Sequence, residues 1–206
     1  PDIVCFVNGL PLVVIEAKRP DSNKEGKSTN AEAISQHIRN QKQDEIPHLY
    51  AYSQLLLAIN GHEGLYATCG TKNKFWAKWK EEQIPEAEFV RLKNHKLSDE
   101  QLNELFNHRP AKAKDDYLSL VAAGDLTITD QDRLIVSLLR PERLLDITRL
   151  FTLFDKKAGK IVARYQQVFG IKALIERINT FDDSGAREGG VIWHTTGSGK
   201  SFTMVF

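Results

Sequence analysis

Two apolar runs open the chain and flank a turn signal. Residues 3–7 and 10–15 are rich in β-branched side chains, and Asn8-Gly9 stands between them. Such a pattern is typical of a β-hairpin. The second run ends in Glu16-Ala17-Lys18. Residues two apart on a strand share a face, so the pattern predicts that Glu16 and Lys18 point the same way.

The segments after the hairpin alternate between helical and extended patterns. Residues 31–44 predict a helix with Ala31, Ile34, Ile38 and Gln41 along its apolar stripe. Pro47 starts a new element, and residues 49–59 are apolar enough to be buried. A further strand is predicted at 65–69. Together these segments predict a mixed α/β sheet with one face covered by the 31–44 helix.

The second half of the chain predicts mainly helices. Residues 81–96 predict an irregular charged segment, 98–106 a capped helix and 109–116 a polar connector. Two more helices are predicted at 129–139 and 141–154, followed by a flexible basic link at 156–160. A long helix at 165–179 and a loop at 181–190 come next. The organisation that follows is a first domain over residues 1–155, a linker over 156–164 and the start of a second domain over 165–206.

Composition restricts the function only weakly. The net charge of +1 over 206 residues gives no global basic field, so any contact with nucleic acid must be local. Cys5 and Cys69 form no spacing pattern, which indicates a reducing compartment, the cytoplasm. No apolar run approaches the roughly 18 residues of a membrane span, so we expect no membrane partner.

A strip of lysines and aromatic side chains at 72–80 has two interpretations. It could bind phosphates and stack on bases. It could also be an amphipathic edge strand that keeps its lysines in water and so avoids edge pairing. The second interpretation is favoured.

The end of the chain carries a phosphate-binding loop, His194 to Ser201, with the sequence HTTGSGKS. Small residues at Gly197, Ser198 and Gly199 allow backbone N–H groups to close around a phosphate. Residues 190–193 predict the strand before this loop, and residues from 201 onward predict the helix after it.

Two side chains and a bound cation complete that expectation. Lys200 would reach the β- and γ-phosphates of ATP, and the Ser201 hydroxyl would bind Mg²⁺. His194 departs from the general pattern, which has a small residue there. Because a motor also needs a second acidic motif beyond the loop, we expect this chain to be an internal piece of a longer protein.

The opening hairpin has the elements of a second site. Asp2 lies near Glu16 at the open end of the hairpin, where two carboxylates could hold a hard cation beside the ammonium of Lys18. A two-residue turn would place Asp2 opposite Ile15, on the wrong face. The site therefore requires a three-residue loop with Gly9 left-handed, or a β-bulge with the same effect.

These motifs carry a family resemblance. Pro1-Asp2 with Glu16-Ala17-Lys18 resembles the PD-(D/E)xK nuclease signature, and the phosphate loop resembles motif I of superfamily 2 DNA translocases. The pair, in this order, is similar to the restriction (R) subunit of type I restriction enzymes. Phe6–Glu16 matches the nuclease hairpin of that family, and Trp193–Ser201 matches its phosphate loop, including the histidine.

Further stretches add to the resemblance: Pro141–Leu145 and Phe151–Asp155 look like the family's interdomain segment. Ala163–Gln167 resembles its adenine-reading glutamine motif. Within it Gln167 is the better match, two residues after Tyr165, and Gln166 is the competitor.

The resemblance implies a fold and a set of roles. The fold is a restriction-endonuclease-like mixed sheet with helices, followed by the first elements of a RecA-like P-loop domain. Asp2 and Glu16 would bind Mg²⁺, and Lys18 would orient water or stabilise the charged phosphorane. Gln36 matches the glutamine of a Q-x-x-x-Y element, but Asn40 stands where the tyrosine is expected.

The resemblance also implies partners and cofactors. The nucleotide site would comprise Tyr165, Gln167 and the loop residues Thr196, Gly197, Ser198, Gly199, Lys200 and Ser201. Mg²⁺ and ATP are the expected cofactors. Double-stranded DNA and the modification (methyltransferase) and specificity subunits are the expected partners.

Two other functions stay open at this point. The chain could be a nuclease-like module that has lost cleavage and binds DNA beside a helicase. It could also be a P-loop ATPase of another kind behind an unrelated α/β domain. An intact cluster of Asp2, Glu16 and Lys18 would favour an active restriction-subunit nuclease over these two alternatives.

Overall fold

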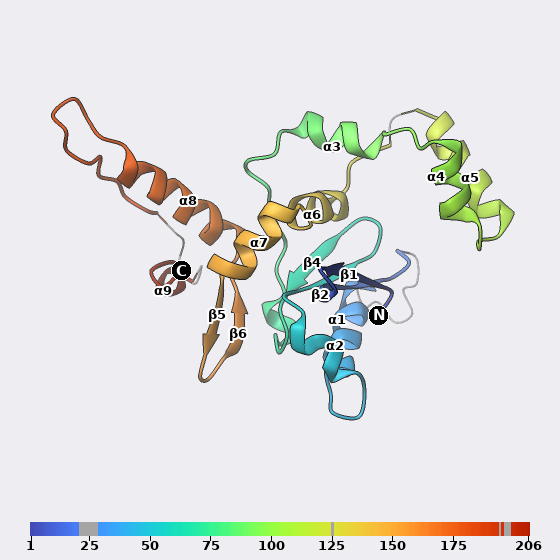
Figure 1. Cartoon of the computed structure of the whole chain (residues 1–206), viewed down its shortest axis with the longest axis horizontal. Helices are drawn as coiled ribbons and strands as arrows, with labels where there is room; N and C mark the ends of the chain where they lie inside the picture. The colour runs from blue at the N-terminus through green and yellow to red at the C-terminus, as the bar shows by residue number, and fades with distance from the viewer. Residues whose placement is uncertain (21–28, 125, 194, 196–198) are drawn as a thin grey trace.

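The computed structural model describes residues 1–20, 29–124, 126–193, 195 and 199–206. Four strands form one mixed sheet in the order β1-β2-β3-β4: β1 (Ile3–Val7), β2 (Leu10–Ala17), β3 (Leu55–Ile59) and β4 (Gly64–Ala67). The β1–β2 and β3–β4 pairs are antiparallel, and β2 and β3 are parallel. The predicted mixed α/β sheet is therefore confirmed (Figure 1).

The opening hairpin has a two-residue turn and a bulge. Asn8 and Gly9 both have positive φ, 49° and 79°, as a tight hairpin turn requires. Val7 pairs with Leu10, but the register shifts between Cys5 and Phe6 and leaves one extra residue in β2. The three-residue loop is thus wrong, and the bulge is the alternative that forms.

Two helices connect β2 to β3 and cover one face of the sheet. These are α1 (Thr29–Asn40) and α2 (Pro47–Tyr52), which pack on β2 and β3. One core cluster fills this layer, made of Val14, Ala33, Ile34, Tyr50, Leu56, Ala58, Ala67 and Trp76.

Helix α1 buries Ile34 as predicted, but the rest of its buried stripe differs from the predicted one. The helix ends at Asn40 rather than at residue 44, and its inward positions include Ala33, His37 and Asn40. Ile38, predicted inside, is 37% exposed. The stripe differs because two polar side chains, His37 and Asn40, lie on the inner face. The spacing of apolar residues alone does not predict buried polar residues.

The other face of the sheet packs against three later helices. They are α6 (Asp130–Leu138), α7 (Pro141–Leu150) and α8 (Tyr165–Asn179). Their buried side chains join Val13, Ile15 and Leu57 in a second core cluster. Both central strands are therefore covered on two sides, which explains why β2 and β3 read as continuous apolar runs.

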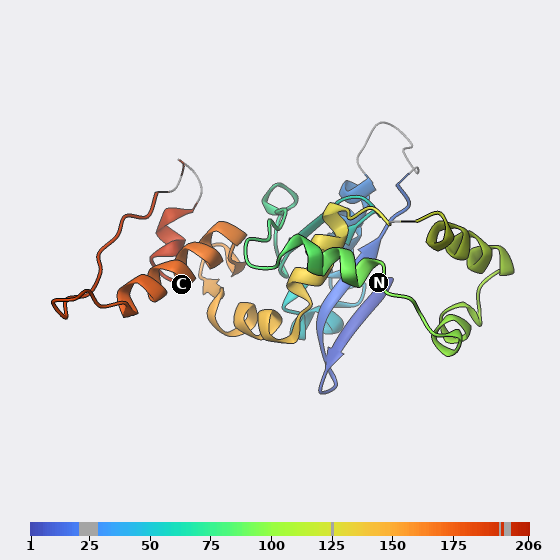
Figure 2. The same ribbon diagram turned by 90° about the horizontal axis from the view of Figure 1, so that it is seen from above.

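Three helices replace segments predicted as irregular or carry a predicted cap. Helix α3 (Glu86–Lys93) lies within 81–96 and α5 (Ala111–Ala122) includes most of the expected connector, so both predictions were wrong. Helix α4 (Asp99–Phe106) confirms the capped helix, with a capping box between Ser98 and Gln101. Figure 2 shows that α4 and α5 project away from the sheet.

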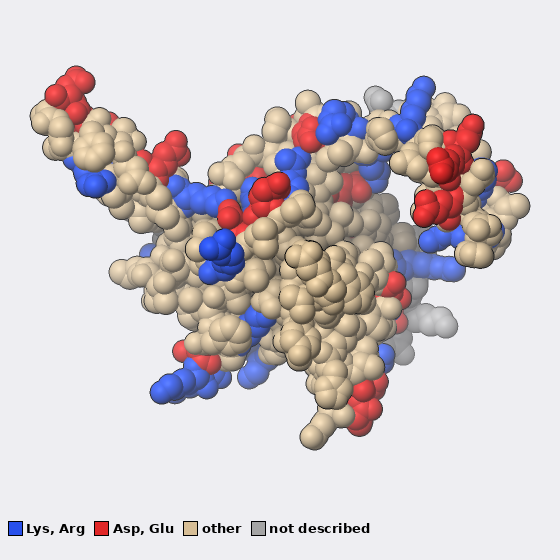
Figure 3. Space-filling view, in the orientation of Figure 1, with Lys and Arg blue, Asp and Glu red and all other residues tan. Residues whose placement is uncertain are grey.

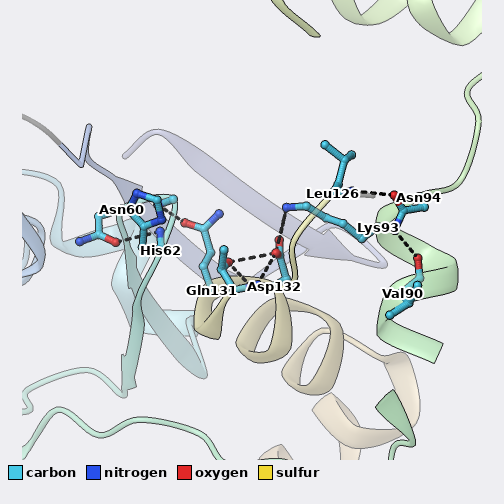
Figure 4. Close-up of polar contacts among 10 residues, drawn as sticks. Asn60, His62, Val90, Lys93, Asn94, Leu126, Gln131 and Asp132 are labelled. Atoms are coloured by element: carbon cyan, nitrogen blue, oxygen red, sulfur yellow. Dashed lines mark hydrogen bonds and ion pairs between the residues drawn. The ribbon is translucent and has the colours of Figure 1, made fainter. Parts of the chain in front are cut away.

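Polar contacts attach α6 to the β3–β4 turn and to α3. The backbone N–H of Gly61 donates to the side-chain oxygen Oε1 of Gln131 over 2.5 Å. The backbone N–H of Gln131 donates to the His62 carbonyl over 3.1 Å. Lys93 Nζ lies 2.8 Å from both carboxylate oxygens of Asp132 (Figure 4). The helical extension is thus fixed to the sheet by hydrogen bonds as well as by packing.

A second hairpin occupies the predicted linker. Strands β5 (Thr152–Asp155) and β6 (Gly159–Val162) pair antiparallel, so residues 156–160 form its turn and the start of β6, not a flexible link. The predicted helix 141–154 accordingly ends at Leu150. Lys160 Nζ donates to the Ser53 carbonyl over 2.9 Å and to Gln54 Oε1 over 2.7 Å, which fixes the hairpin to the sheet domain.

The lysine and aromatic strip follows the favoured interpretation in part. Trp76 and Trp79 are buried, and the strip's four lysines are exposed. The strip forms a short 3₁₀ turn, η1 (Asn73–Phe75), and a single bridge from Ala77 to Tyr66 rather than a full edge strand. Its aromatic side chains are therefore mainly core residues.

The C-terminal segment confirms one prediction and corrects another. Helix α8 has the predicted bounds, 165–179. Residues 190–193 form no strand, and Val191 and Trp193 are 90% and 88% exposed. A strand of a parallel sheet needs a hydrogen-bonded neighbour, and the described residues provide none here. After the phosphate loop comes a short helix, α9 (Lys200–Thr203).

The charge distribution on the surface and the length of the helices bear on which partners are expected. Figure 3 shows basic and acidic side chains in mixed groups rather than in one basic field. Within the described part of the chain, no helix is both long and apolar enough to cross a membrane.

Candidate functional site

The bulged hairpin brings the two predicted carboxylates to the same end of the sheet. Pairing of Ile3 with Ile15 places the next residue outward, Asp2, opposite Glu16 on the α1 face. Asp2 Oδ2 accepts a hydrogen bond from the Ala17 amide over 2.7 Å. This bond holds the exposed Asp2 carboxylate against the end of β2, beside the fully buried Glu16.

Two side chains of α1 contact the site from above the sheet. Lys18 Nζ donates to Gln36 Oε1 over 2.5 Å, and Asn40 Nδ2 donates to Glu16 Oε1 over 3.2 Å. Gln36 and Asn40 are one helical turn apart and therefore share a face. In the structure Asp2, Glu16, Lys18 and Gln36 lie at the same end of the sheet, and Asn40 joins them.

One carboxylate oxygen of Glu16 accepts a hydrogen bond, and the other has no hydrogen-bond partner among the described residues. The Glu16 Oε2 atom is buried and has no hydrogen-bond partner among the described residues. Burial raises the pKa of Glu16, with a further increase from Asp2, while the Lys18 ammonium lowers it.

The donor set fits a hard divalent cation. An orphaned buried carboxylate oxygen is costly unless something compensates it, and Mg²⁺ prefers such oxygens together with water. Among the described residues no group of three or more acidic, histidine or cysteine side chains converges, so a cation here would have at most two side-chain carboxylates as ligands. Mg²⁺ sites with one or two carboxylates are usual.

A buried polar group lies behind Asn40. His37 Nε2 lies 2.9 Å from the Leu57 carbonyl, and His37 Nδ1 lies 3.3 Å from the Tyr50 hydroxyl. The His37 ring also stacks on Trp76, with centroids 5.3 Å apart. Burial lowers the pKa of His37 to about 4, which keeps the ring neutral at pH 7.

Tyr50 connects this group to Asn40. Burial raises the pKa of Tyr50 to about 12, and a hydrogen bond with Asn40 acts in the opposite direction. Sequence reasoning missed His37 and Tyr50. Tyr50 comes from a different helix, and only the packing of α2 beside α1 shows the contact.

The predicted nucleotide site is described in part. Thr196, Gly197 and Ser198 lie outside the described residues, as does His194. Gly199 has φ 85° and precedes α9, and Lys200 and Ser201 are exposed at the start of that helix. The positive φ at residue 199 favours glycine, and a Cβ there would lie 2.7 Å from Gln167 Nε2 and would displace the end of that side chain.

Gln167 contacts the phosphate loop directly. Its Nε2 donates to the Gly199 carbonyl over 3.0 Å, and its Oε1 accepts from the Arg164 amide over 2.8 Å. The competitor, Gln166, has a buried Oε1 without a partner among the described residues. Tyr165 is half-buried against the core. The structure therefore brings Gln167, rather than Gln166, to the loop.

A cavity of about 530 Å³ opens next to this contact. Gln167 and Gly199 form one side of it, and the other side comes from the sheet domain and the β5–β6 hairpin. Lys72, Lys160 and Arg164 give its lining positive charge.

Comparisons with known proteins match both ends of the chain. Residues 1–75 match the family described as type I restriction enzyme R protein N terminus, and residues 166–206 match the SWI2/SNF2 ATPase family. The first match contains the hairpin and α1, and the second contains Gln167 and the phosphate loop.

Individual relatives cover the chain from end to end. It is 33% identical to the type I restriction enzyme HindI endonuclease subunit of Haemophilus influenzae, over all of this chain and 16% of that protein. It is 30% identical to a protein named as the MjaIXP endonuclease subunit in Methanocaldococcus jannaschii, over all of this chain and 18% of that protein. The chain thus spans less than a fifth of the length of these relatives.

Proposed function

Because this chain belongs to the family of type I restriction enzyme R subunits, we propose that its hairpin site cleaves DNA and that its phosphate loop begins an ATP-driven motor. One observation carries the cleavage proposal. The bulge sets Asp2 opposite Glu16 while Glu16 keeps a buried oxygen without a partner, beside the ammonium of Lys18.

Asp2 and Glu16 are the proposed ligands of Mg²⁺. The cation, when bound, would activate a water molecule and offset charge on a DNA phosphodiester. Lys18 contributes a further positive charge that stabilises the charge developing on the phosphorane. Gln36 holds the Lys18 ammonium through its 2.5 Å hydrogen bond, so that this charge need not be repositioned during the reaction.

ATP is the proposed ligand of the second site. Lys200 would contact the β- and γ-phosphates, and Ser201 would bind the accompanying Mg²⁺. The contact between Gln167 and Gly199, with the adjoining cavity, supports placing the adenine beside Gln167 and Tyr165. Hydrolysis would drive translocation of double-stranded DNA, in complex with methyltransferase and specificity subunits.

Paired variants of a restriction subunit that contains this chain test the proposal. Glu16→Ala should abolish DNA cleavage by the reconstituted enzyme and leave ATP hydrolysis largely unchanged, because the two sites are separate. Lys200→Ala should stop ATP hydrolysis and translocation, and with them any cleavage that depends on translocation. Loss of both activities in Glu16→Ala would show that the hairpin is structural, and unchanged cleavage would indicate a nuclease-like module without this chemistry.

A further inference from the structure

Asn40 fixes one half of the Glu16 carboxylate. Its amide donates to Glu16 Oε1 over 3.2 Å, and both side chains are buried, at 6% and 0% exposure. The other oxygen, Oε2, has no partner in the described part of the chain. Donation by Asn40 to Oε1 orients the carboxylate and leaves Oε2 without a protein partner among the described residues.

The orientation of the Asn40 amide is itself determined by the residues behind it. The Leu57 carbonyl can only accept a hydrogen bond, so His37 Nε2 must carry the ring proton. In the neutral ring Nδ1 is then an acceptor, and the Tyr50 hydroxyl must donate to it. This leaves the Tyr50 oxygen as an acceptor.

The donor and acceptor roles of His37 and Tyr50 therefore also determine the orientation of the Asn40 amide. The Asn40 amide nitrogen donates to the Glu16 carboxylate, and Asn40 also lowers the pKa of Tyr50, the direction that donation to the Tyr50 oxygen produces. Only the amide nitrogen, with its two hydrogens, can serve both. Rotation of the amide by 180° would place an oxygen against two acceptors.

We propose that Asn40 is a positioning residue for the nuclease metal site, held by Tyr50 and His37 so that Glu16 presents Oε2 to the cation. The proposal rests on the proposed function. It also accounts for the departure at residue 40, where the Q-x-x-x-Y pattern has tyrosine. The aromatic hydroxyl is present in this chain, but it comes from α2 and acts through Asn40.

A purely structural role predicts a different result. If these residues only fill the core, their loss lowers stability and leaves cation affinity unchanged. A positioning role instead changes the affinity of the Glu16 site, because residues that orient a metal ligand typically contribute 10–100-fold to metal affinity. Metal affinity therefore separates the two roles.

The experiment is a calorimetric titration of a restriction subunit containing this chain with Mn²⁺, without nucleotide. Binding that disappears in Glu16→Ala defines the site. Asn40→Ala should weaken this binding about 10–100-fold. Tyr50→Phe removes only the hydroxyl and should weaken it about 2–10-fold, equivalent to one hydrogen bond. Ser35→Ala, an exposed position of the same helix, is the control and should bind like the wild type.

Each outcome decides between the two claims. Absence of Glu16-dependent Mn²⁺ binding in the wild type would overturn the proposed function, and the positioning role with it. Glu16-dependent binding that is unchanged in Asn40→Ala and Tyr50→Phe would overturn the positioning role alone. If Asn40→Ala does not fold, Tyr50→Phe decides, since it keeps the ring and its packing.

Discussion

At the scale of single residues, the site depends on a carboxylate that the fold does not fully satisfy. Glu16 lies at the end of a strand covered on both faces, and its Oε2 has no hydrogen bond within the described residues. A buried charged group with an unpaired atom reduces folding stability. Proteins retain such groups at functional sites, where a ligand supplies the missing partner.

The first prediction concerns stability against pH. Because the pKa of Glu16 is raised in the folded state, the folded protein keeps this proton at pH values where the unfolded chain has lost it. Stability should fall as pH rises from the ordinary value of 4.5 through the raised pKa. Glu16→Gln should remove this loss and stabilise metal-free protein by about 1–3 kcal/mol at pH 7.

Denaturant unfolding of both proteins from pH 4 to pH 8 measures the difference. The advantage of Glu16→Gln should grow with pH and should shrink when Mg²⁺ is added. A difference that is constant over this range, or that favours the wild type without metal, would contradict the assignment of Glu16 as an uncompensated carboxylate.

The second prediction concerns Gln36 and Lys18. Gln36→Ala frees the Lys18 ammonium from its 2.5 Å partner, so DNA cleavage should fall about 10–100-fold, the value of one hydrogen bond to a charged group. Mn²⁺ affinity should stay unchanged, since Gln36 does not contact a carboxylate ligand. Gln43→Ala, an exposed glutamine beyond the same helix, is the control. Equal cleavage by both variants would remove Gln36 from the site.

At the scale of elements, the second hairpin fixes residues 152–162 to the sheet domain through one lysine. Lys160 donates to the Ser53 carbonyl and to Gln54 Oε1 from a half-buried position. We predict that Lys160→Met increases hydrogen exchange in β5 and β6, because two hydrogen bonds are lost. Lys156→Met, at the exposed turn of the same hairpin, should leave exchange unchanged. Faster exchange in both variants would instead indicate a general effect of charge.

The elements show where sequence patterns were sufficient. The Asn8-Gly9 hairpin, the helix capped by Ser98 and the helix at 165–179 all depend on local chemistry and were predicted. Helices α3 and α5 were missed because their first turns have no capping side chain, each following a proline. Helical periodicity in such short charged segments is weak.

The site was predictable only as far as it is local in sequence. The spacing of Asp2, Glu16 and Lys18 predicted which residues form the site. Comparison of the two possible hairpin registers predicted that Asp2 and Glu16 share a face only if the register is shifted by one residue. The register that forms depends on a bulge within the strands, beyond the Asn8-Gly9 turn, and no local pattern predicts that bulge. The contact between His37 and Tyr50 joins two helices packed beside each other on one face of the sheet, so no local pattern contains it.

At the scale of the whole molecule, the two sites differ in how well the fold supports them. The nuclease residues are attached to a sheet that is covered on both faces. The phosphate loop is preceded by exposed residues without strand pairing and followed by a helix of four residues. A helix this short does not hold its structure unaided.

The fourth prediction follows from this difference. The 206-residue chain, purified by itself, should show no measurable ATP hydrolysis and at best weak nucleotide binding. A coupled phosphate-release assay with Mg²⁺ and ATP, with Lys200→Ala as the background, measures this. Sustained turnover above that background would mean that the loop forms without a neighbouring strand.

The central claim is that the bulged hairpin holds a divalent cation between Asp2 and Glu16. Anomalous diffraction from Mn²⁺-soaked crystals of a restriction subunit containing this chain tests it most directly. We expect a Mn²⁺ peak in contact with Glu16 Oε2 and the Asp2 carboxylate, with Asn40 still donating to Glu16 Oε1. No Mn²⁺ at these two carboxylates, at a concentration that supports cleavage, would contradict it.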